Sequence, residues 1–242
     1  MQKIKTSVRI LWVVDATESM SPYISTMKEF MKNSYNKIKV ALGEAARAVE
    51  YLEIQIATFR DLFEEKGDEA FHMSKIFRLP EDEQELISAI DEIQCFGGGD
   101  DPESSMQALY LALKRSPQFN KYDAQKSRYI IMLATDALTH SFEEFEKRGG
   151  KTKFPDYPDD ELPKSLDEFY DEYHRAQNNI FKTLGIEPKD VRLNLFAPLE
   201  GDFSRKTGLA TWNNVTSQNV MQNNNLKEIK EDALLASIVA SY

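Results

Sequence analysis

Apolar residues recur along this chain with two periods. In some segments they are continuous or alternate with polar residues, which is typical of strands. Residues 8–14 and 129–134 are apolar almost throughout, the pattern of central parallel strands covered on both faces, whereas residues 51–59 alternate with a period of two. The expected strands are residues 8–14, 51–59, 74–79, 129–134 and 191–197.

In other segments the apolar residues recur about every 3.6 positions, which is typical of amphipathic helices. Residues 21–42 show this spacing most clearly, through Ile24, Met27, Met31, Tyr35, Ile38 and Leu42. The expected helices are residues 21–42, 81–93, 102–114, 165–184 and 226–239. Because strands and helices alternate, we predict an α/β fold with a doubly wound, mainly parallel sheet flanked by helices.

A length of 242 residues suits one domain, so we expect a single domain over residues 1–242. Within this domain, one segment departs from the alternation of strands and helices. Residues 138–190 form a long insertion after the fourth expected strand, with a polar stretch containing proline and glycine ahead of the helix at 165–184. A long excursion at the carboxyl end of a strand is typical of a lid or a binding surface.

Charge and composition narrow the range of partners. The chain carries 40 acidic and 30 basic residues, a formal charge of −10. This balance disfavours nucleic acid, whose backbone needs clustered Lys and Arg, and favours cations or partners with basic patches. The single cysteine, Cys95, is interpreted as a small buried residue. No stretch reaches the roughly 20 apolar residues of a membrane span, so we expect a cytoplasmic protein without membrane contact.

Three acidic loops adjoin the predicted strands and helices. They are Asp15-Ala16-Thr17-Glu18-Ser19 after the first strand, Gly97-Gly98-Gly99-Asp100-Asp101-Pro102-Glu103, and Thr135-Asp136 after the fourth strand. Ligands of open α/β sheets bind where the carboxyl ends of the strands meet, so these loops can meet over one ion. Carboxylates and hydroxyls suit Mg²⁺, Mn²⁺ or Ca²⁺ rather than zinc. The alternative is that Asp15 only N-caps the helix that begins near Ser21.

These loops carry a resemblance to a known family. The chain resembles the von Willebrand factor type A domain family, whose ligand site is a metal-ion-dependent adhesion site. The family's Asp-x-Ser-x-Ser motif reads Asp15-Ala16-Thr17-Glu18-Ser19, Gly-Gly-Asp-x-Pro-Glu reads Gly98-Gly99-Asp100-Asp101-Pro102-Glu103, and Thr-Asp-Gly reads Thr135-Asp136-Ala137. The first motif has Thr for Ser and the third has Ala for Gly. The resemblance implies a Rossmann-like sheet of six strands.

The resemblance also implies a set of ion ligands. They are Thr17 and Ser19 directly, Asp15 and Asp136 directly or through water, and Glu103 or Asp101 from the second loop. The ion would be Mg²⁺, or else Mn²⁺ or Ca²⁺, with one coordination position open to a carboxylate of a partner protein. No catalytic residue is implied. Intracellular family members often serve as adaptors beside ATPases, kinases or phosphatases encoded nearby, so such a protein is an expected partner.

A second ion is compatible with the same resemblance. Some family members hold a calcium ion beside the adhesion site, and the matching positions here are Asp61 and Asp100. The alternative, which we favour, is that Asp61 pairs with Arg60 or Lys66 or caps a turn. His140 could reach the ion or orient Asp136, but a histidine on the surface of a loop is the simpler interpretation.

Three functions remain open from the sequence. The leading hypothesis is a non-enzymatic, cation-dependent protein-binding module in which residues 138–190 shape the choice of partner. The alternative is a Mg²⁺-dependent phosphotransferase or phosphatase with Asp15 as the nucleophile and Asp101 as a metal ligand. The lack of a suitably placed lysine argues against that alternative. A third hypothesis is a scaffold that keeps the fold but no longer needs an ion.

Overall fold

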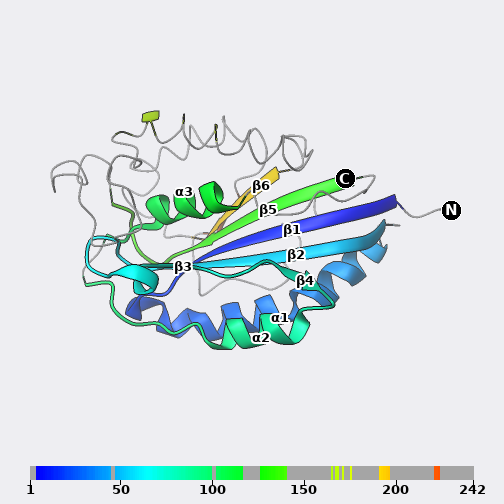
Figure 1. Cartoon of the computed structure of the whole chain (residues 1–242), viewed down its shortest axis with the longest axis horizontal. Helices are drawn as coiled ribbons and strands as arrows, with labels where there is room; N and C mark the ends of the chain where they lie inside the picture. Colours follow the sequence, from blue (N-terminus) through cyan, green and yellow to red (C-terminus); the bar gives the residue numbers. More distant parts are fainter. Residues whose placement is uncertain are drawn as a thin grey trace.

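A mixed sheet with helices on its faces forms the centre of the protein (Figure 1). The computed structural model describes residues 4–44, 47–99, 102–116, 126–140, 165, 167, 168, 171, 175, 191–196 and 221–223. The strands among these residues are β1 Ile4–Asp15, β2 Arg47–Phe59, β3 Phe71–Met73, β4 Phe77–Leu79, β5 Lys126–Ala134, β6 Val191–Phe196 and β7 Met221–Asn223. The helices are α1 Ser21–Glu44, α2 Glu83–Asp91 and α3 Ser105–Arg115.

The strand order places β1 in the interior of the sheet. The order is β3-β2-β1-β5-β6-β7, with β4 also paired to β2. β1 pairs in parallel with β2 and β5, β6 pairs in parallel with β5 and β7, and β3 and β4 run antiparallel to β2. In this register Asp15 lies opposite Phe59, and Val14 lies opposite Ala134. The loops that follow β1, β2 and β5 therefore begin side by side at one edge.

The two faces of β1 are covered by different helices. Figure 1 shows α1 and α2 on one face of the sheet and α3 on the other. Val8, Ile10, Trp12 and Val14 belong to one apolar cluster with Met27, Phe30 and Met31 of α1. The Trp12 and Phe30 rings meet edge to face, with their centroids 5.7 Å apart. Burial on both faces explains why this strand is apolar almost throughout.

Arg9 is the one charged residue inside the apolar run of β1. Its Nε lies 3.2 Å from Oε2 of Glu53, its neighbour on β2, and both side chains are buried. Arg78, on the outer strand β4, also faces Glu53, with 3.6 Å between Nε and Oε1. A buried charge is tolerated in a core only when it is paired, and here its partner comes from the adjacent strand.

The predicted α/β class is confirmed, and the structure corrects its details. All five predicted strands are present, but β3 and β7 were missed because each has only three residues. The described residues contain seven strands, so a sheet of six is wrong. The helix at 226–239 and most of the insertion 138–190 lie outside the described residues. The doubly wound arrangement of the whole chain and its single-domain organisation therefore stay predictions.

Two expectations from composition are also tested. Cys95 is half-buried, not fully buried as expected, because it lies in the loop after α2. Desolvation raises the pKa of its thiol above the usual range. Within the described part of the chain, none of the helices combines the length and the apolar character that a membrane span requires.

Candidate metal site

The first loop begins with a buried carboxylate. Asp15 is the last residue of β1 and is completely buried. Its Oδ1 accepts hydrogen bonds from the backbone N–H of Thr17 at 2.9 Å and from Thr17 Oγ1 at 2.7 Å, and its Oδ2 accepts one from Thr135 Oγ1 at 2.6 Å. Burial raises the pKa of Asp15 to about 6, against the lowering effect of these hydrogen bonds.

These contacts correct the interpretation of Asp15 as an N-cap. α1 begins at Ser21, and Asp15 bonds to Thr17 rather than to the first turn of that helix. A single 3₁₀ turn, Glu18–Met20, lies between the loop and α1. Asp15 therefore shapes its own loop, and the turn that follows holds Ser19 close to Thr17.

A chain of four oxygen-bearing side chains connects the first loop to the third. Thr17 Oγ1 lies 3.1 Å from Ser19 Oγ, and Ser19 Oγ donates to Asp136 Oδ1 at 2.8 Å. Each hydroxyl has one proton, and these protons go to Asp15 and Asp136. The two hydroxyl oxygens then face each other through lone pairs alone. Such a pair of oxygens, flanked by two carboxylates, fits a hard cation.

The second loop approaches the first through glycine. The backbone N–H of Phe96 donates to the carbonyl of Ala16 at 3.0 Å, and that of Glu18 donates to the carbonyl of Gly97 at 3.1 Å. Gly98 has a φ of +99°, and a Cβ built on it would lie 2.5 Å from Glu103 Oε1 and 2.7 Å from Thr17 Cγ2. The backbone of Gly98 therefore lies directly against both side chains.

The second loop is also tied to the third. The backbone N–H of Glu103 donates to the carbonyl of Leu138 at 2.7 Å, and that of His140 donates to the carbonyl of Glu103 at 2.8 Å. Glu103 and Thr139 form an isolated parallel bridge. The three acidic loops expected from the sequence therefore meet. Together they line a cavity of about 430 Å³ that includes Thr17, Ser19, Glu103 and Asp136.

The donor chemistry of this cavity differs from that of a carboxylate cluster. Among the described residues, no group of three or more His, Cys, Asp and Glu side chains is arranged to hold a metal ion. An ion here would rest on the hydroxyls of Thr17 and Ser19 together with Asp15 and Asp136. Few direct anionic ligands leave a bound cation electrophilic. Asp100 and Asp101 lie outside the described residues, so their part in the site stays a prediction.

Asp61 lies in a different network. It is completely buried, and its Oδ1 accepts hydrogen bonds from the Phe63 backbone N–H at 2.9 Å and from Ser104 Oγ at 3.0 Å. The same oxygen lies 3.2 Å from His140 Nε2. Asp61 therefore caps a turn, one of the favoured alternatives, and the ionisable side chain beside it is that of His140 rather than Arg60 or Lys66.

The interpretation of His140 as a surface residue is also wrong. His140 is buried and packs edge to face on Phe63, with the ring centroids 4.7 Å apart. Its imidazole faces Asp61 rather than Asp136. Together with Ser104, this pair fastens the loop after β2 to the second and third loops. No periodicity or motif in the sequence predicts this contact, because Asp61, Ser104 and His140 are distant from one another in the sequence.

Comparisons with known proteins bear on the fold. The family model described as von Willebrand factor A domain matches residues 70–147, a segment that includes the second and third loops but begins after the first. No curated protein matches the sequence of the chain. The pilus adhesin SpaC from Lactobacillus rhamnosus GG aligns with 98% of this chain and 31% of its own, at 11% identity and a TM-score of 0.54.

Two further solved structures align with the chain. Proximal thread matrix protein 1 from the mussel byssus aligns with 99% of this chain and 49% of its own, at 12% identity and a TM-score of 0.51. A von Willebrand factor type A protein from Catenulispora acidiphila aligns with 97% of this chain and 43% of its own, at 11% identity and a TM-score of 0.48. The chain thus spans from a third to a half of the length of these structures. The family model thus matches one segment of the chain, and the pilus adhesin and the byssus protein share its fold.

Proposed function

We propose that this chain is a divalent-cation-dependent protein-binding module. The ion, Mg²⁺ or else Mn²⁺ or Ca²⁺, is held by the hydroxyls of Thr17 and Ser19, with Asp15 and Asp136 acting directly or through water. A partner protein supplies an Asp or Glu carboxylate to an open coordination position. The observation that carries the proposal is the run of oxygens from Asp15 to Asp136, in which both hydroxyl protons go to carboxylates.

When it is bound, the ion supplies a positive centre that attracts the partner's carboxylate. The residues of the chain position the ion's ligands. Asp15 orients Thr17 through two hydrogen bonds, and Thr135 holds the other oxygen of Asp15 in place. Glu103, which lines the cavity, adds negative charge beside the hydroxyls. Gly97 and Gly99, which are exposed on either side of the buried Gly98, carry no side chains and leave room for a partner at the cavity.

The burial of Asp15 weighs against the alternative phosphotransferase. A nucleophilic aspartate must reach the phosphorus of its substrate, but Asp15 is completely buried and both of its oxygens accept hydrogen bonds. Among the described residues that line the cavity there is also no lysine to neutralise a phosphate. The names of the neighbours, a pilus adhesin and a byssus matrix protein, agree with a binding role.

Thermal unfolding in the presence of metal tests the ion site. A ligand that binds only the folded state at 100 times its Kd stabilises it by about 2.7 kcal/mol. We expect Mg²⁺ or Mn²⁺ to raise the Tm of the wild-type chain and of the exposed control Asp167→Ala, and to leave the Tm of Asp136→Ala unchanged. Equal shifts in the two variants would refute the site, and no shift in the wild type would favour the ion-free scaffold.

Capture of the partner tests the binding role. The chain is immobilised and exposed to an extract of its source cell, once with Mg²⁺ and once with a chelator. A partner, expected to be a kinase, phosphatase or ATPase encoded nearby, should be retained by the wild type only with Mg²⁺, and by Ser19→Ala under neither condition. Retention in the presence of the chelator would contradict the proposal. Hydrolysis of p-nitrophenyl phosphate that Asp15→Asn abolishes would favour the alternative enzyme.

A further inference from the structure

Three consecutive glycines, Gly97-Gly98-Gly99, form the part of the second loop that lines the candidate ion cavity beside Thr17. All three have a positive φ, of +67°, +99° and +61°. Glycine loses more conformational freedom on folding than any other residue, so contacts from elsewhere in the chain must hold such a segment in one conformation. Because Gly98 lies directly against Thr17, the contacts that hold the glycines also bear on the ion site.

The middle glycine is held by a carboxylate from another loop. Glu65 lies in the loop after β2, residues 60–70, and is half-buried. Its Oε1 accepts a hydrogen bond from the backbone N–H of Gly98 at 2.9 Å. A Cβ built on Gly97 would lie 2.5 Å from the same oxygen, so the carboxylate also lies against the backbone of Gly97. Within the described part of the chain, no other side chain forms a hydrogen bond with the three glycines.

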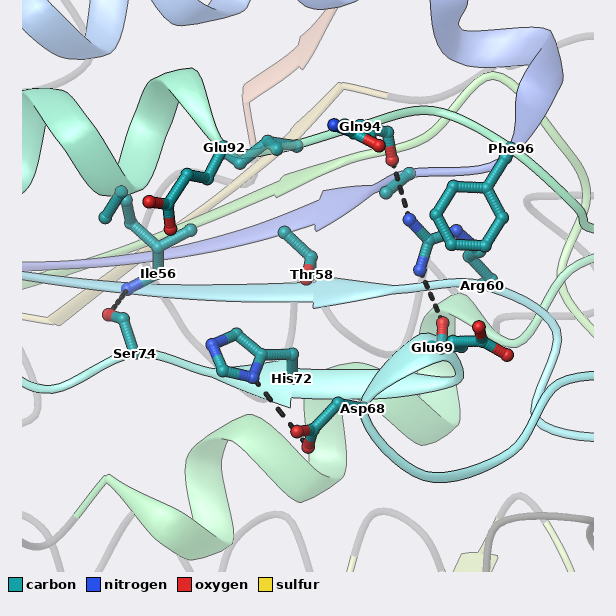
Figure 2. Close-up of a pocket in the computed structure, with 13 residues that line it drawn as sticks. Ile56, Thr58, Arg60, Asp68, Glu69, His72, Ser74, Glu92, Gln94 and Phe96 are labelled. Carbon is teal, nitrogen blue, oxygen red and sulfur yellow. Dashed lines mark hydrogen bonds and ion pairs between the residues drawn. The ribbon is translucent and has the colours of Figure 1, made fainter.

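The residues just before the glycines are held by a guanidinium from the same loop. Arg60 Nη2 donates to the carbonyl of Gln94 at 2.6 Å, and Nη1 donates to the carbonyl of Glu69 at 2.5 Å (Figure 2). The ring of Phe96 covers the guanidinium, with 3.6 Å between its centroid and Cζ. Desolvation lowers the pKa of Arg60, and the charge of Glu65 opposes this most strongly. Arg60 and Glu65 therefore hold one stretch of backbone from the same side.

The other side of the glycines contacts the first loop. The backbone N–H of Glu18 donates to the carbonyl of Gly97 at 3.1 Å, and a Cβ on Gly98 would lie 2.7 Å from Thr17 Cγ2. Thr17 Oγ1 in turn donates to Asp15 and lies 3.1 Å from Ser19 Oγ. A β-branched side chain has few χ1 orientations. The contact of the Thr17 methyl group with Gly98 therefore favours the orientation in which Oγ1 faces Ser19.

We propose that Glu65 is a positioning residue of the ion site, supported by Arg60. It holds Gly98, and Gly98 keeps Thr17 in the orientation that binds the cation. Glu65 itself is not among the described residues that line the ion cavity, so it acts through the glycines and not as a ligand. The inference rests on the proposed function, because it concerns the affinity of the same site for its ion.

The test compares Glu65→Gln with Glu65→Met in the full chain, with terbium luminescence as the measure of affinity for a hard cation. Both variants lose the charge and keep the length of the side chain, but only Gln keeps an oxygen that can accept from Gly98. The apparent affinity falls with the fraction of molecules in which the site is formed. We expect Glu65→Met to bind terbium about three- to tenfold more weakly than Glu65→Gln, the range of one hydrogen bond.

Two further variants separate the hydrogen bond from charge. Asp68→Asn removes an exposed carboxylate from the same loop and should bind terbium like the wild type, because solvent and salt screen that charge. Arg60→Lys keeps a charge but lacks the fork that reaches two carbonyls, so it should bind terbium more weakly than the wild type. Urea unfolding of each variant shows that the protein is folded under the conditions of the titration.

Amide hydrogen exchange in the metal-free protein measures the hold on Gly98 directly. The Gly98 amide should exchange faster in Glu65→Met than in Glu65→Gln, because only the second variant keeps its acceptor. Equal exchange at Gly98, or equal terbium affinity of the two variants while the wild type binds terbium, would overturn this inference and leave the proposed function standing. A wild type that binds no terbium would refute the proposed function and this inference with it.

Discussion

The close approach of Gly98 to the candidate ion site makes Gly98→Ala a sharp test of the site's geometry. A Cβ at this position would lie 2.5 Å from Glu103 Oε1, 2.7 Å from Thr17 Cγ2 and 2.8 Å from Thr17 Cβ. Real Cβ atoms do not approach so closely, so Thr17 and Glu103 would have to move apart. The added methyl group would also occupy a residue whose φ is +99°.

Two costs add at this position. A non-glycine residue held at such a φ costs about 1–3 kcal/mol, and forcing a methyl group into a filled space costs about 1–3 kcal/mol. Gly98→Ala should therefore lower the free energy of unfolding by about 2–6 kcal/mol. Gly67 is the matched control, because its φ is +53° but a Cβ there would meet nothing within 4 Å. Gly67→Ala should cost only the backbone strain, about 1–2 kcal/mol.

Urea unfolding of the metal-free variants measures these costs, and terbium luminescence measures the affinity for a hard cation. We expect Gly98→Ala to be less stable than Gly67→Ala by at least about 1 kcal/mol. We also expect it to bind terbium much more weakly, because Thr17 is displaced. Gly67→Ala should bind terbium like the wild type. Equal stability of the two variants, or wild-type terbium affinity in Gly98→Ala, would refute the close contact between Gly98 and Thr17.

Three further changes test the buried charges. In the metal-free protein, burial raises the pKa of Asp15 to about 6 from 3.8, so the native state keeps a proton that the unfolded chain loses. Stability should then fall by up to about 3 kcal/mol as the pH rises from about 4 to above 6. Saturating Mg²⁺ should reduce this loss of stability. If urea unfolding without metal gave the same stability at every pH in this range, the result would contradict the burial of Asp15. Asp61→Ala removes the acceptor shared by Ser104, Phe63 and His140, and should cost about 3–5 kcal/mol in urea unfolding; a loss below about 1 kcal/mol would show that this network is exposed to water. Arg9→Met should cost about 3–5 kcal/mol because it leaves the buried Glu53 with the exposed Arg78, rather than a buried guanidinium, as a charged neighbour. Adding Glu53→Leu should recover most of that loss, whereas additive losses in the two variants would contradict their pairing.

The core of the fold could be predicted because its signal is local. β1 and β5 are apolar on both faces, and α1 has apolar residues at helical spacing. Each of these elements can therefore be predicted from its own residues alone. β3 and β7 do not, because three residues hold too little of a period to detect. Both exist only through pairing with a longer strand, β2 or β6.

Some contacts of the candidate site could likewise be predicted from the sequence, and others could not. The convergence of the loops of Asp15 and Asp136 follows from parallel strands that end at one edge, and the structure joins them through Ser19. The partners of Asp61 could not be predicted, because Ser104 and His140 are brought to it by the folding of two other loops. No role was predicted for Thr135, whose hydroxyl fixes the second oxygen of Asp15, although its position directly after β5 is a signal that could have indicated one.

Anomalous diffraction from crystals grown with Mn²⁺ tests the central claim most directly. If the hydroxyls of Thr17 and Ser19 hold a hard divalent cation, the manganese peak should lie about 2.1 Å from both oxygens, close to Asp15 and Asp136. A peak elsewhere, or none at the cavity while Mn²⁺ saturates the protein in solution, would contradict the account.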